Sequence, residues 1–196
     1  LLPITYDEIG SSNFDELNSD GLNFDDDIDI FRIESNEKYG YANTKGEIIV
    51  NPTYDSAGSF SEGYADVCNN EKYGFIDQKG KLVIPCQYDK TLSFKENVCG
   101  VCVGEKWGVI NKKGKYIANP KYDSMSSYSE GYAAIKKDDK WGYIDTKGKE
   151  VIKTKYVDAY SFINGKAVVE DSKNKLGIIN TNDKWLKTIK YDIYPI

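Results

Sequence analysis

Short apolar segments alternate with polar turns along this chain, and the apolar positions repeat every two residues. One segment places Ala65 and Val67 two residues apart, and another places Ala133 and Ile135 in the same way. Side chains two residues apart on a strand point to the same face, so the pattern predicts strands with one buried face. No segment shows the 3.6-residue pattern of a helix with several turns. The hydrophobic pattern therefore predicts an all-β protein.

A Lys-aromatic-Gly signature recurs about every 34 residues. Such a period indicates one supersecondary unit copied in tandem. A residue type that returns in every copy is usually part of the scaffold, which argues against an enzyme. The Gly is expected where a neighbouring aromatic side chain or backbone approaches closely. The signatures begin at Lys38, Lys72, Lys106, Lys140 and Lys175.

Each unit predicts three short antiparallel strands. The signature strand, such as 140–144, turns at Lys147-Gly148 into a β-branched strand. A Tyr-Asp pair such as Tyr122-Asp123 follows, and a third strand, such as 131–135, closes the unit. The Asp of the pair is expected to hydrogen-bond the backbone just after it, as in an Asx turn.

We therefore expect three-stranded antiparallel meanders of about 34 residues, stacked into an elongated twisted array. An open or partial β-propeller is the alternative, because its blades also contain several strands each. A start without Met, inside a unit, indicates a piece of a longer protein. The expected boundaries are one tandem-repeat domain over 1–196, with full repeats at 37–70, 71–104, 105–138 and 139–173, a partial first unit with an acidic insertion at 1–36 and a partial last unit at 174–196.

The segment KWGYIDTKGKEVI at residues 140–152 resembles the bacterial WG-repeat family, and similar segments cover nearly the whole chain. The resemblance implies a repetitive β scaffold, often in surface or multidomain proteins, with no catalytic residues to transfer. The departures from the pattern are Tyr39, Tyr73 and Leu176 at the Trp position, Val157 at the Asp position and Asp183 at the turn Gly.

Aromatic residues make up 13% of the chain and include 16 Tyr and 3 Trp. A thin repeat needs large side chains to fill its core, so most repeated aromatics are expected to be buried. Trp185 lies outside the signature positions and is the candidate exposed binding residue. The aromatics expected in the core are Trp107, Trp141, Phe60, Phe94 and Phe162.

An acidic insertion within residues 11–29 interrupts the repeat. Residues 13–29 contain seven acidic residues and no Lys or Arg, so the net charge of -5 is a local property of this segment. Asp25, Asp27 and Asp29 alternate as at the start of a calcium loop, but the Gly and Glu that an EF-hand needs later are missing. A solvated acidic loop is expected, with a calcium site at these three residues as the alternative and no other cofactor.

The four cysteines have different expected roles. Cys99 replaces a buried Ala position and is expected in the core. Cys99 and Cys102 are three apart on a strand, point to opposite faces and do not suit one metal. Cys68 and Cys102 occupy equivalent positions in adjacent repeats, so a disulfide is the alternative to reduced thiols there, while the state of Cys86 is left open.

The chain contains no His, which removes every His-dependent triad, and it has no nucleophile-elbow or P-loop motif. A single Arg and the lack of a basic stripe argue against nucleic acid, and no apolar run is long enough to cross a membrane. The expected function is a non-catalytic scaffold that binds protein, within a longer bacterial protein. Carbohydrate or cell-wall binding through exposed Tyr and Trp is the second hypothesis, and a hydrolase using carboxylates is the third. A secreted or surface location and a cytoplasmic one both stay open.

Deleting residues 13–27 is expected to leave the thermal unfolding of the repeats unchanged, because the insertion lies outside the repeated pattern. Binding of a basic partner should weaken, most of all at low salt, where charge attraction is least screened. Titration calorimetry with calcium tests the narrower cation site. No heat at millimolar calcium would reject it.

Overall fold

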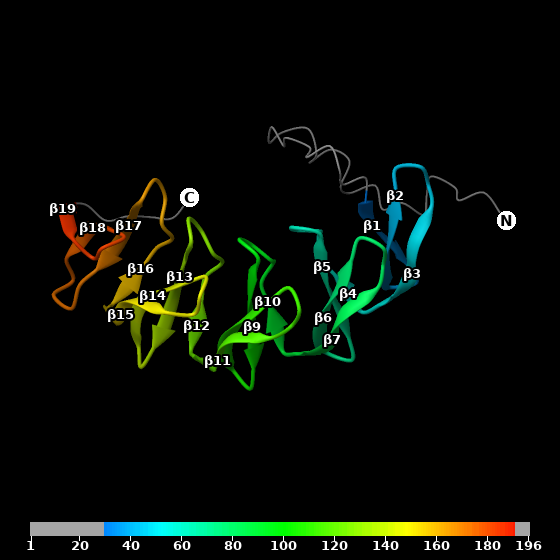
Figure 1. The fold of residues 1–196 in the computed structure, drawn as a ribbon, viewed down its shortest axis with the longest axis horizontal. Coiled ribbons are helices and arrows are strands. Elements are labelled where there is room, and N and C mark those ends of the chain that lie inside the picture. Colours follow the sequence, from blue (N-terminus) through cyan, green and yellow to red (C-terminus); the bar gives the residue numbers. More distant parts are fainter. Residues whose placement is uncertain (1–29, 191–196) are drawn as a thin grey trace. The chain divides into compact units, whose positions relative to one another are not determined.

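The computed structural model describes residues 30–190, and their regular structure consists of strands alone (Figure 1). The strands form five sheets, numbered here along the chain. Sheet 1 contains β1 (Ile30–Ser35), β2 (Lys38–Asn43) and β3 (Ile48–Tyr54). Sheet 2 contains β4 (Ser56–Ala57), β5 (Tyr64–Asn69), β6 (Lys72–Asp77) and β7 (Leu82–Tyr88). Sheet 3 contains β8 (Lys90–Thr91), β9 (Val98–Val103), β10 (Lys106–Asn111) and β11 (Tyr116–Tyr122). Sheet 4 contains β12 (Ser124–Met125), β13 (Tyr132–Lys137), β14 (Lys140–Asp145) and β15 (Glu150–Tyr156). Sheet 5 contains β16 (Asp158–Ala159), β17 (Lys166–Glu170), β18 (Leu176–Asn180) and β19 (Trp185–Thr188).

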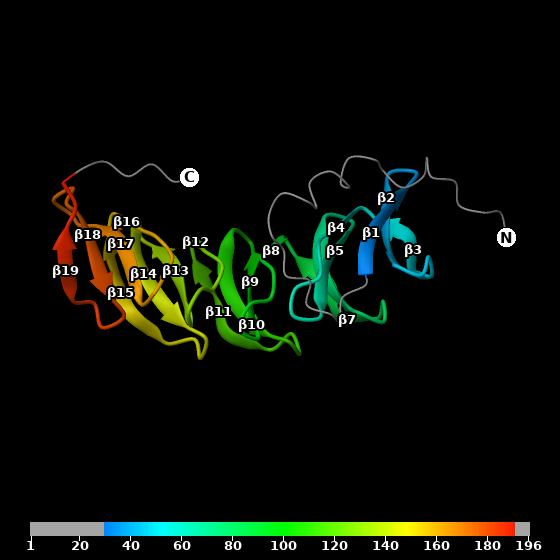
Figure 2. The same ribbon diagram turned by 90° about the horizontal axis from the view of Figure 1, so that it is seen from above.

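The chain divides into two compact units, Leu1–Gln87 and Tyr88–Ile196, which are described separately. Sheets 1 and 2 belong to the first unit, and sheets 3, 4 and 5 belong to the second. In the second unit all neighbouring strands are antiparallel and follow the chain order within each sheet. Figure 2 shows the sheets of each unit following one another along the chain. The acidic insertion, with Asp25, Asp27 and Asp29, lies outside the described residues. Among residues 30–190 no helix is long and apolar enough to cross a membrane.

The all-β tandem-repeat architecture is confirmed, but the repeats have one strand more than expected. Sheets 2 to 5 each begin with a two-residue strand, which follows a Tyr-Asp pair in sheets 2 to 4 and Tyr156-Val157 in sheet 5. In sheet 4 this strand pairs Ser124 with Lys136 and Met125 with Ile135. So short a segment carries no alternating pattern, and only its pairing with the closing strand makes it a strand.

The turn after each signature strand is fixed by an Asx side chain. In sheet 4 the Asp145 carboxylate accepts the N–H of Lys147 at 2.9 Å and of Lys149 at 2.8 Å. Gly148 supplies the left-handed conformation that the turn needs, with φ at 82°. The same capping is made by Asn43, Asp77, Asn111 and Asn180.

The Gly of each signature lies beneath a bulged strand. In sheet 4 Trp141 pairs with Tyr156, but Tyr143 pairs with Ile152, so β15 has two extra residues at this point. The bulge brings the Ile152 carbonyl oxygen to 2.4 Å from the position that a Cβ on Gly142 would occupy. The close approach expected from the sequence is confirmed here, because no side chain fits in that space. Backbone also covers Gly40, Gly74 and Gly108.

Each sheet has two faces that alternate along the strands. Where two sheets of the same unit pack together, we call the packed face of the earlier sheet its C-side face and the packed face of the later sheet its N-side face. Between sheets 3 and 4, Val109 on a C-side face packs in one cluster with Ile135 and Ile144 on an N-side face. Between sheets 4 and 5, Tyr143 packs with Val169 in the same way. In the first unit the cluster between sheets 1 and 2 contains Tyr41, Ala57, Ala65, Val67 and Ile76.

Some aromatics expected in the core are only partly buried. Phe94 and Phe162 are buried as expected, but Phe60, Trp107 and Trp141 are half-buried. Trp141 pairs with the last residue of β15, so it lies at the rim of its sheet. The fully buried aromatic comes two residues later, at Tyr143. Cys99 is buried, as expected, and the four cysteines Cys68, Cys86, Cys99 and Cys102 are free thiols.

We expect Gly142→Ala to lower the free energy of unfolding by about 3 kcal/mol, since the added Cβ forces backbone to move. Gly165→Ala is the matched control, with φ at 70° but nothing within 4 Å of the added Cβ. Its cost should be about 1 kcal/mol, from the left-handed conformation alone. Urea unfolding followed by circular dichroism measures both. Equal losses would contradict the close-approach explanation.

Candidate functional site

In three of the described repeats, the Asp that follows the Tyr links distant parts of its own repeat. The Asp123 carboxylate forms an ion pair with Lys106 and accepts the N–H of Asp138 at 3.0 Å. The expectation of a cap on the backbone just after the Asp was therefore wrong, because the capped turn lies 15 residues further on. The closing strand pairs with the short strand beside Asp123, which brings that turn to the carboxylate. Asp55 and Asp89 cap equivalent turns at Asn70 and Gly104.

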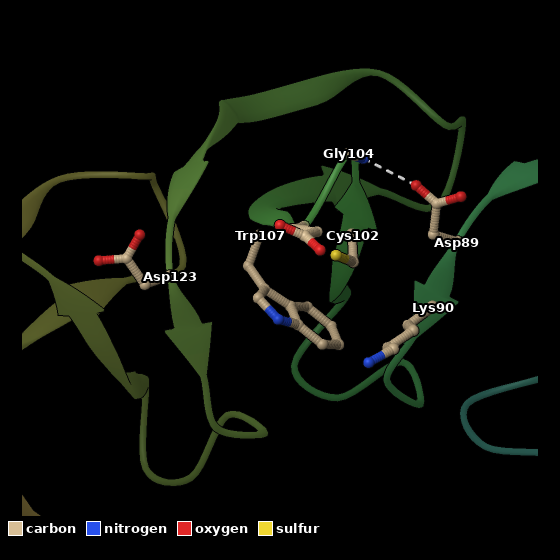
Figure 3. Close-up of a pocket in the computed structure, with 7 residues that line it drawn as sticks. Asp89, Lys90, Cys102, Gly104, Trp107 and Asp123 are labelled. Carbon is tan, nitrogen blue, oxygen red and sulfur yellow. Dashed lines mark hydrogen bonds between the residues drawn. The ribbon is translucent and has the colours of Figure 1, made fainter.

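A hollow of about 510 Å³ opens beside Trp107 in the second unit (Figure 3). The indole is half-buried and lies on the C-side face of sheet 3. Figure 3 shows it between Asp123 on one side and Lys90 on the other. The hollow is lined by Asp89, Lys90, Cys102, Gly104, Glu105, Trp107 and Asp123.

A small side chain next to the Trp distinguishes this repeat from the following one. Trp107 pairs with Cys102, whereas Trp141 pairs with Lys136 in the next repeat. The Lys136 ammonium lies 3.0 Å from Asp139. The side chain paired with the signature Trp is therefore shorter in the repeat of Trp107 than in the repeat of Trp141.

The hollow is lined by carboxylates, by the cation Lys90 and by a neutral thiol. The hydrogen bond from Lys106 lowers the pKa of Asp123, and burial only partly opposes this effect. Burial raises the pKa of the Cys102 thiol, and the charge of Asp89 acts in the same direction. Cys102 is therefore a thiol near pH 7, which makes it a poor nucleophile. Within the described part of the chain, no group of three or more acidic or Cys side chains is placed to hold a metal ion.

The first repeat already places a cation over its signature aromatic. The Arg32 guanidinium carbon lies 5.2 Å from the centroid of the Tyr39 ring. Its Nη1 also donates a hydrogen bond to the carbonyl of Ala57 at 2.8 Å. The equivalent position in the repeat of Trp107 is Gly100, which has no side chain. The aromatic position of the signature can thus hold a positive charge against its ring.

Trp185 is half-buried rather than exposed. It pairs with Ile179, and its indole Cζ2 lies 2.0 Å from the position of a Cβ on Gly177. Its Nε1 donates a hydrogen bond to Thr188 Oγ1 at 3.2 Å. The indole thus covers the signature Gly of the last repeat, where backbone covers that Gly in the others. Its role in binding stays a prediction.

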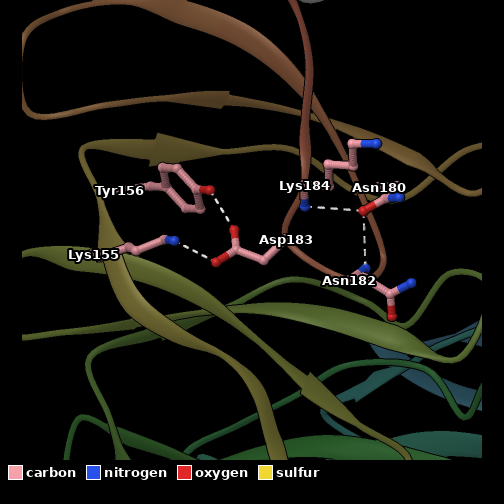
Figure 4. A network of polar contacts seen from close by, with 6 residues as sticks. All are labelled: Lys155, Tyr156, Asn180, Asn182, Asp183 and Lys184. Atoms are coloured by element: carbon pink, nitrogen blue, oxygen red, sulfur yellow. Dashed lines mark hydrogen bonds and ion pairs between the residues drawn. The ribbon is translucent and has the colours of Figure 1, made fainter.

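Asp183 joins two repeats in a polar network (Figure 4). Its carboxylate accepts a hydrogen bond from the Tyr156 hydroxyl and forms an ion pair with Lys155. One repeat earlier, Glu150 accepts a hydrogen bond from Tyr122 at 2.9 Å and lies 3.1 Å from Lys121.

The polar links of Glu150 and Asp183 connect adjacent sheets and contain no reactive group. Burial raises the pKa of Glu150, but the hydrogen bonds from Tyr122 and Lys121 outweigh it and lower the pKa overall. Sequence reasoning treated Asp183 only as a departure from the turn Gly. The spacing of about 28 residues between each Lys-Tyr pair and the next acid was the available signal.

A second carboxylate link went unrecognised in the sequence. The Glu130 carboxylate accepts the N–H of Asn164 at 2.5 Å and of Gly165 at 2.7 Å in the following repeat. Glu96 accepts the N–H of Gly131 at 2.8 Å in the same way. These carboxylates hold loops of adjacent repeats together, so their repetition reflects architecture rather than catalysis.

The model of the WG containing repeat family matches residues 39–73, 73–107, 107–141 and 141–175. The chain belongs to the WG containing repeat family. A search of the curated proteins found no match to this WG-repeat chain.

Several solved structures resemble the WG-repeat chain in fold. The match to Hsv2 of Kluyveromyces marxianus has a TM-score of 0.53 and 10% identity, and it covers 82% of this chain and 58% of the Hsv2 chain. The match to Hsv2p of Kluyveromyces lactis has a TM-score of 0.51 and 12% identity, and it covers 79% of this chain and 59% of the Hsv2p chain. The match to BamB of Moraxella catarrhalis has a TM-score of 0.47 and 9% identity, and it covers 83% of this chain and 58% of the BamB chain. The WG-repeat chain thus spans about three fifths of the solved chains it matches. The two Hsv2 structures, whose TM-scores exceed 0.5, are propeller-like, which agrees with the alternative form of the predicted fold.

We expect Lys106→Met to raise the pKa of Asp123 toward the ordinary value of an aspartate, because the hydrogen bond that lowers it is lost. In the native protein the carboxylate stays charged to a lower pH. The stabilising pair is therefore complete above the unfolded pKa and is lost as the pH falls through the folded pKa. Carboxyl NMR titration measures the shift. Lys113→Met, on the hairpin turn, is the control and should leave Asp123 unchanged.

Proposed function

We propose that this chain is a non-catalytic interaction module that captures a basic segment of a partner protein, within a longer bacterial protein. The observation that carries the proposal is the half-buried indole of Trp107 in a hollow whose lining has three carboxylates, at Asp89, Glu105 and Asp123, and one cation, at Lys90. An aromatic face next to carboxylates suits a Lys or Arg side chain, which gains cation–π and charge attraction together.

The contact between Arg32 and Tyr39 supports the choice of a basic ligand. It places a guanidinium over the aromatic that stands at the position of Trp107 in the first repeat. In the repeat of Trp107 the chain supplies no Arg, since Gly100 stands in its place. A partner residue would fill the role that Arg32 has beside Tyr39.

A scaffold function also fits the chemistry of the repeated polar residues. Asp123 and Asp89 cap backbone turns, and Glu130 joins neighbouring repeats. The family match and the propeller-like neighbours favour an interaction module over an enzyme. A hydrolase that uses carboxylates therefore ranks third, and neither nucleic acid nor a cofactor enters the proposal.

Glycan binding is the second candidate, because a half-buried indole beside carboxylates also suits a sugar ring. The ring would stack on Trp107, and its hydroxyls would donate hydrogen bonds to the carboxylates. Trp185 is the weaker site for a sugar, since its indole covers Gly177.

We expect Trp107→Ala to weaken binding of a Lys/Arg-rich peptide about tenfold, since a cation–π contact contributes about 1–2 kcal/mol. Fluorescence anisotropy of the labelled peptide at low salt measures the affinity. Trp141→Ala is the matched control, because Lys136 lies beside that indole, and it should have little effect.

An acidic peptide of equal length tests the charge preference. Equal binding of both peptides, or equal loss in both Trp variants, would contradict the proposed basic ligand. Sugar binding on a glycan array that disappears in Trp107→Ala would favour the second candidate instead.

A further inference from the structure

A row of three paired residues crosses sheet 3 and ends on a lysine. Lys90 of β8 pairs with Cys102 of β9, and Cys102 pairs with Trp107 of β10. Residues paired across antiparallel strands point to the same face, so all three side chains lie on the C-side face of the sheet. All three also line the hollow. Lys90 and Trp107 are two strand spacings apart, so their backbones are separated by about 10 Å.

The charges of the hollow are separated across the indole. Figure 3 shows the Trp107 ring in the middle, with Asp123 on one side and Lys90 on the other. The Lys90 side chain is exposed, and within residues 30–190 its ammonium forms no ion pair. Among the described residues, the charge of Lys90 is therefore left for a ligand to pair.

The cation at Lys90 is particular to this repeat. The residues at the same position in the short strands of sheets 2, 4 and 5 are Ser56, Ser124 and Asp158. In the repeat of Trp141 the lysine stands directly beside the Trp, at Lys136, and lies 3.0 Å from Asp139. A residue that changes while the backbone repeats is not required by the scaffold. Lys90 is thus placed to select a ligand rather than to hold the fold.

We propose that the basic segment captured at Trp107 is the carboxyl-terminal end of a protein, with Lys or Arg as its last residue and a free α-carboxylate. This inference rests on the proposed function, because it uses the same hollow. The side-chain cation of the last residue lies against the Trp107 indole near the carboxylates. The α-carboxylate of the same residue pairs with the Lys90 ammonium. Capture of a chain end through its terminal carboxylate is a recurring mode of peptide recognition.

An acidic side chain inside a longer segment fits this arrangement less well. In an extended peptide, neighbouring side chains point to opposite sides, so an acid next to the bound Lys or Arg points away from the hollow. The α-carboxylate belongs to the bound residue itself, and no following residue has to leave the hollow.

Two peptides that differ only at the carboxyl end test the proposal. Both end in Lys, one with a free carboxylate and the other with an amide. The lining has three carboxylates and one cation, so charge attraction alone favours the more positive amide. We expect the opposite order, with the free acid binding about fivefold tighter, which is the effect of one exposed ion pair. Fluorescence anisotropy at low salt, with the label at the amino end, measures both affinities.

Variants of Lys90 assign the preference to its charge. Lys90→Met should remove the preference for the free acid without weakening the amide, whereas Lys90→Arg keeps the charge and should keep the preference. Lys95→Met is the matched control, because Lys95 is an exposed lysine of the loop between β8 and β9 that does not line the hollow, and it should behave like the wild type. Circular dichroism establishes that each variant is folded. Lys90→Gln replaces Lys90→Met if that variant does not fold.

Equal binding of the two peptides to the wild type would overturn the proposal, and so would a preference that survives in Lys90→Met. A third peptide has Lys followed by Asp near its end and an amidated terminus. If it bound as tightly as the free acid, the carboxylate would not have to be that of a chain end, and the proposal would fall.

Trp107→Ala separates the failure of this inference from the failure of the proposed function. If Trp107→Ala weakens the binding of both peptides while the wild type binds them equally, the basic ligand stands and its assignment to a chain end falls. If Trp107→Ala leaves the binding of both peptides unchanged, the proposed function itself falls.

Discussion

The close approach of a bulged strand to a bare glycine is the constraint on which each repeat depends. In sheet 4 the Ile152 carbonyl lies where a side chain on Gly142 would stand. The bulge that produces this approach also carries the chain on to Tyr156, which pairs with Trp141. From there the Tyr156 hydroxyl reaches Asp183 in the next repeat. One missing side chain thus permits both the geometry within a sheet and a polar link between sheets.

Carboxylates accept hydrogen bonds that close turns and join loops in this architecture. Asp145 closes a hairpin turn, Asp123 joins the start of a signature strand to a turn 15 residues further on, and Glu130 holds the next loop. Each accepts backbone N–H groups at an exposed turn or loop, where the carboxylate takes the place of water as the partner. A repeated acid in this chain is therefore better explained by the scaffold than by catalysis.

Binding capacity is expected instead at positions where one repeat differs from the next. Trp107 and Trp141 occupy the same place in their sheets, but Cys102 stands beside one and Lys136 beside the other. The hollow lies beside Trp107, whose strand partner is the shorter of these two side chains. Tandem repeats can vary such surface residues without changing the backbone beneath them, because the scaffold rests on other positions.

The sequence by itself determined the period of the repeat, the strand faces and the need for glycine where another segment approaches closely. These are local or periodic properties: Cys99 could be placed in the core because three other repeats have Ala there, and its burial confirms this. Only the tertiary structure decided that Asp123 caps a turn 15 residues away, that Ser124–Met125 form a fourth strand, and that Trp107 and Trp141 stay half-buried. It also decided that the Trp185 indole covers Gly177 and that the Asp183 carboxylate accepts a hydrogen bond from the Tyr156 hydroxyl. Each of these depends on which strands become neighbours and where a sheet ends. A period in the sequence shows that positions are equivalent, but it does not show what lies across from them in space.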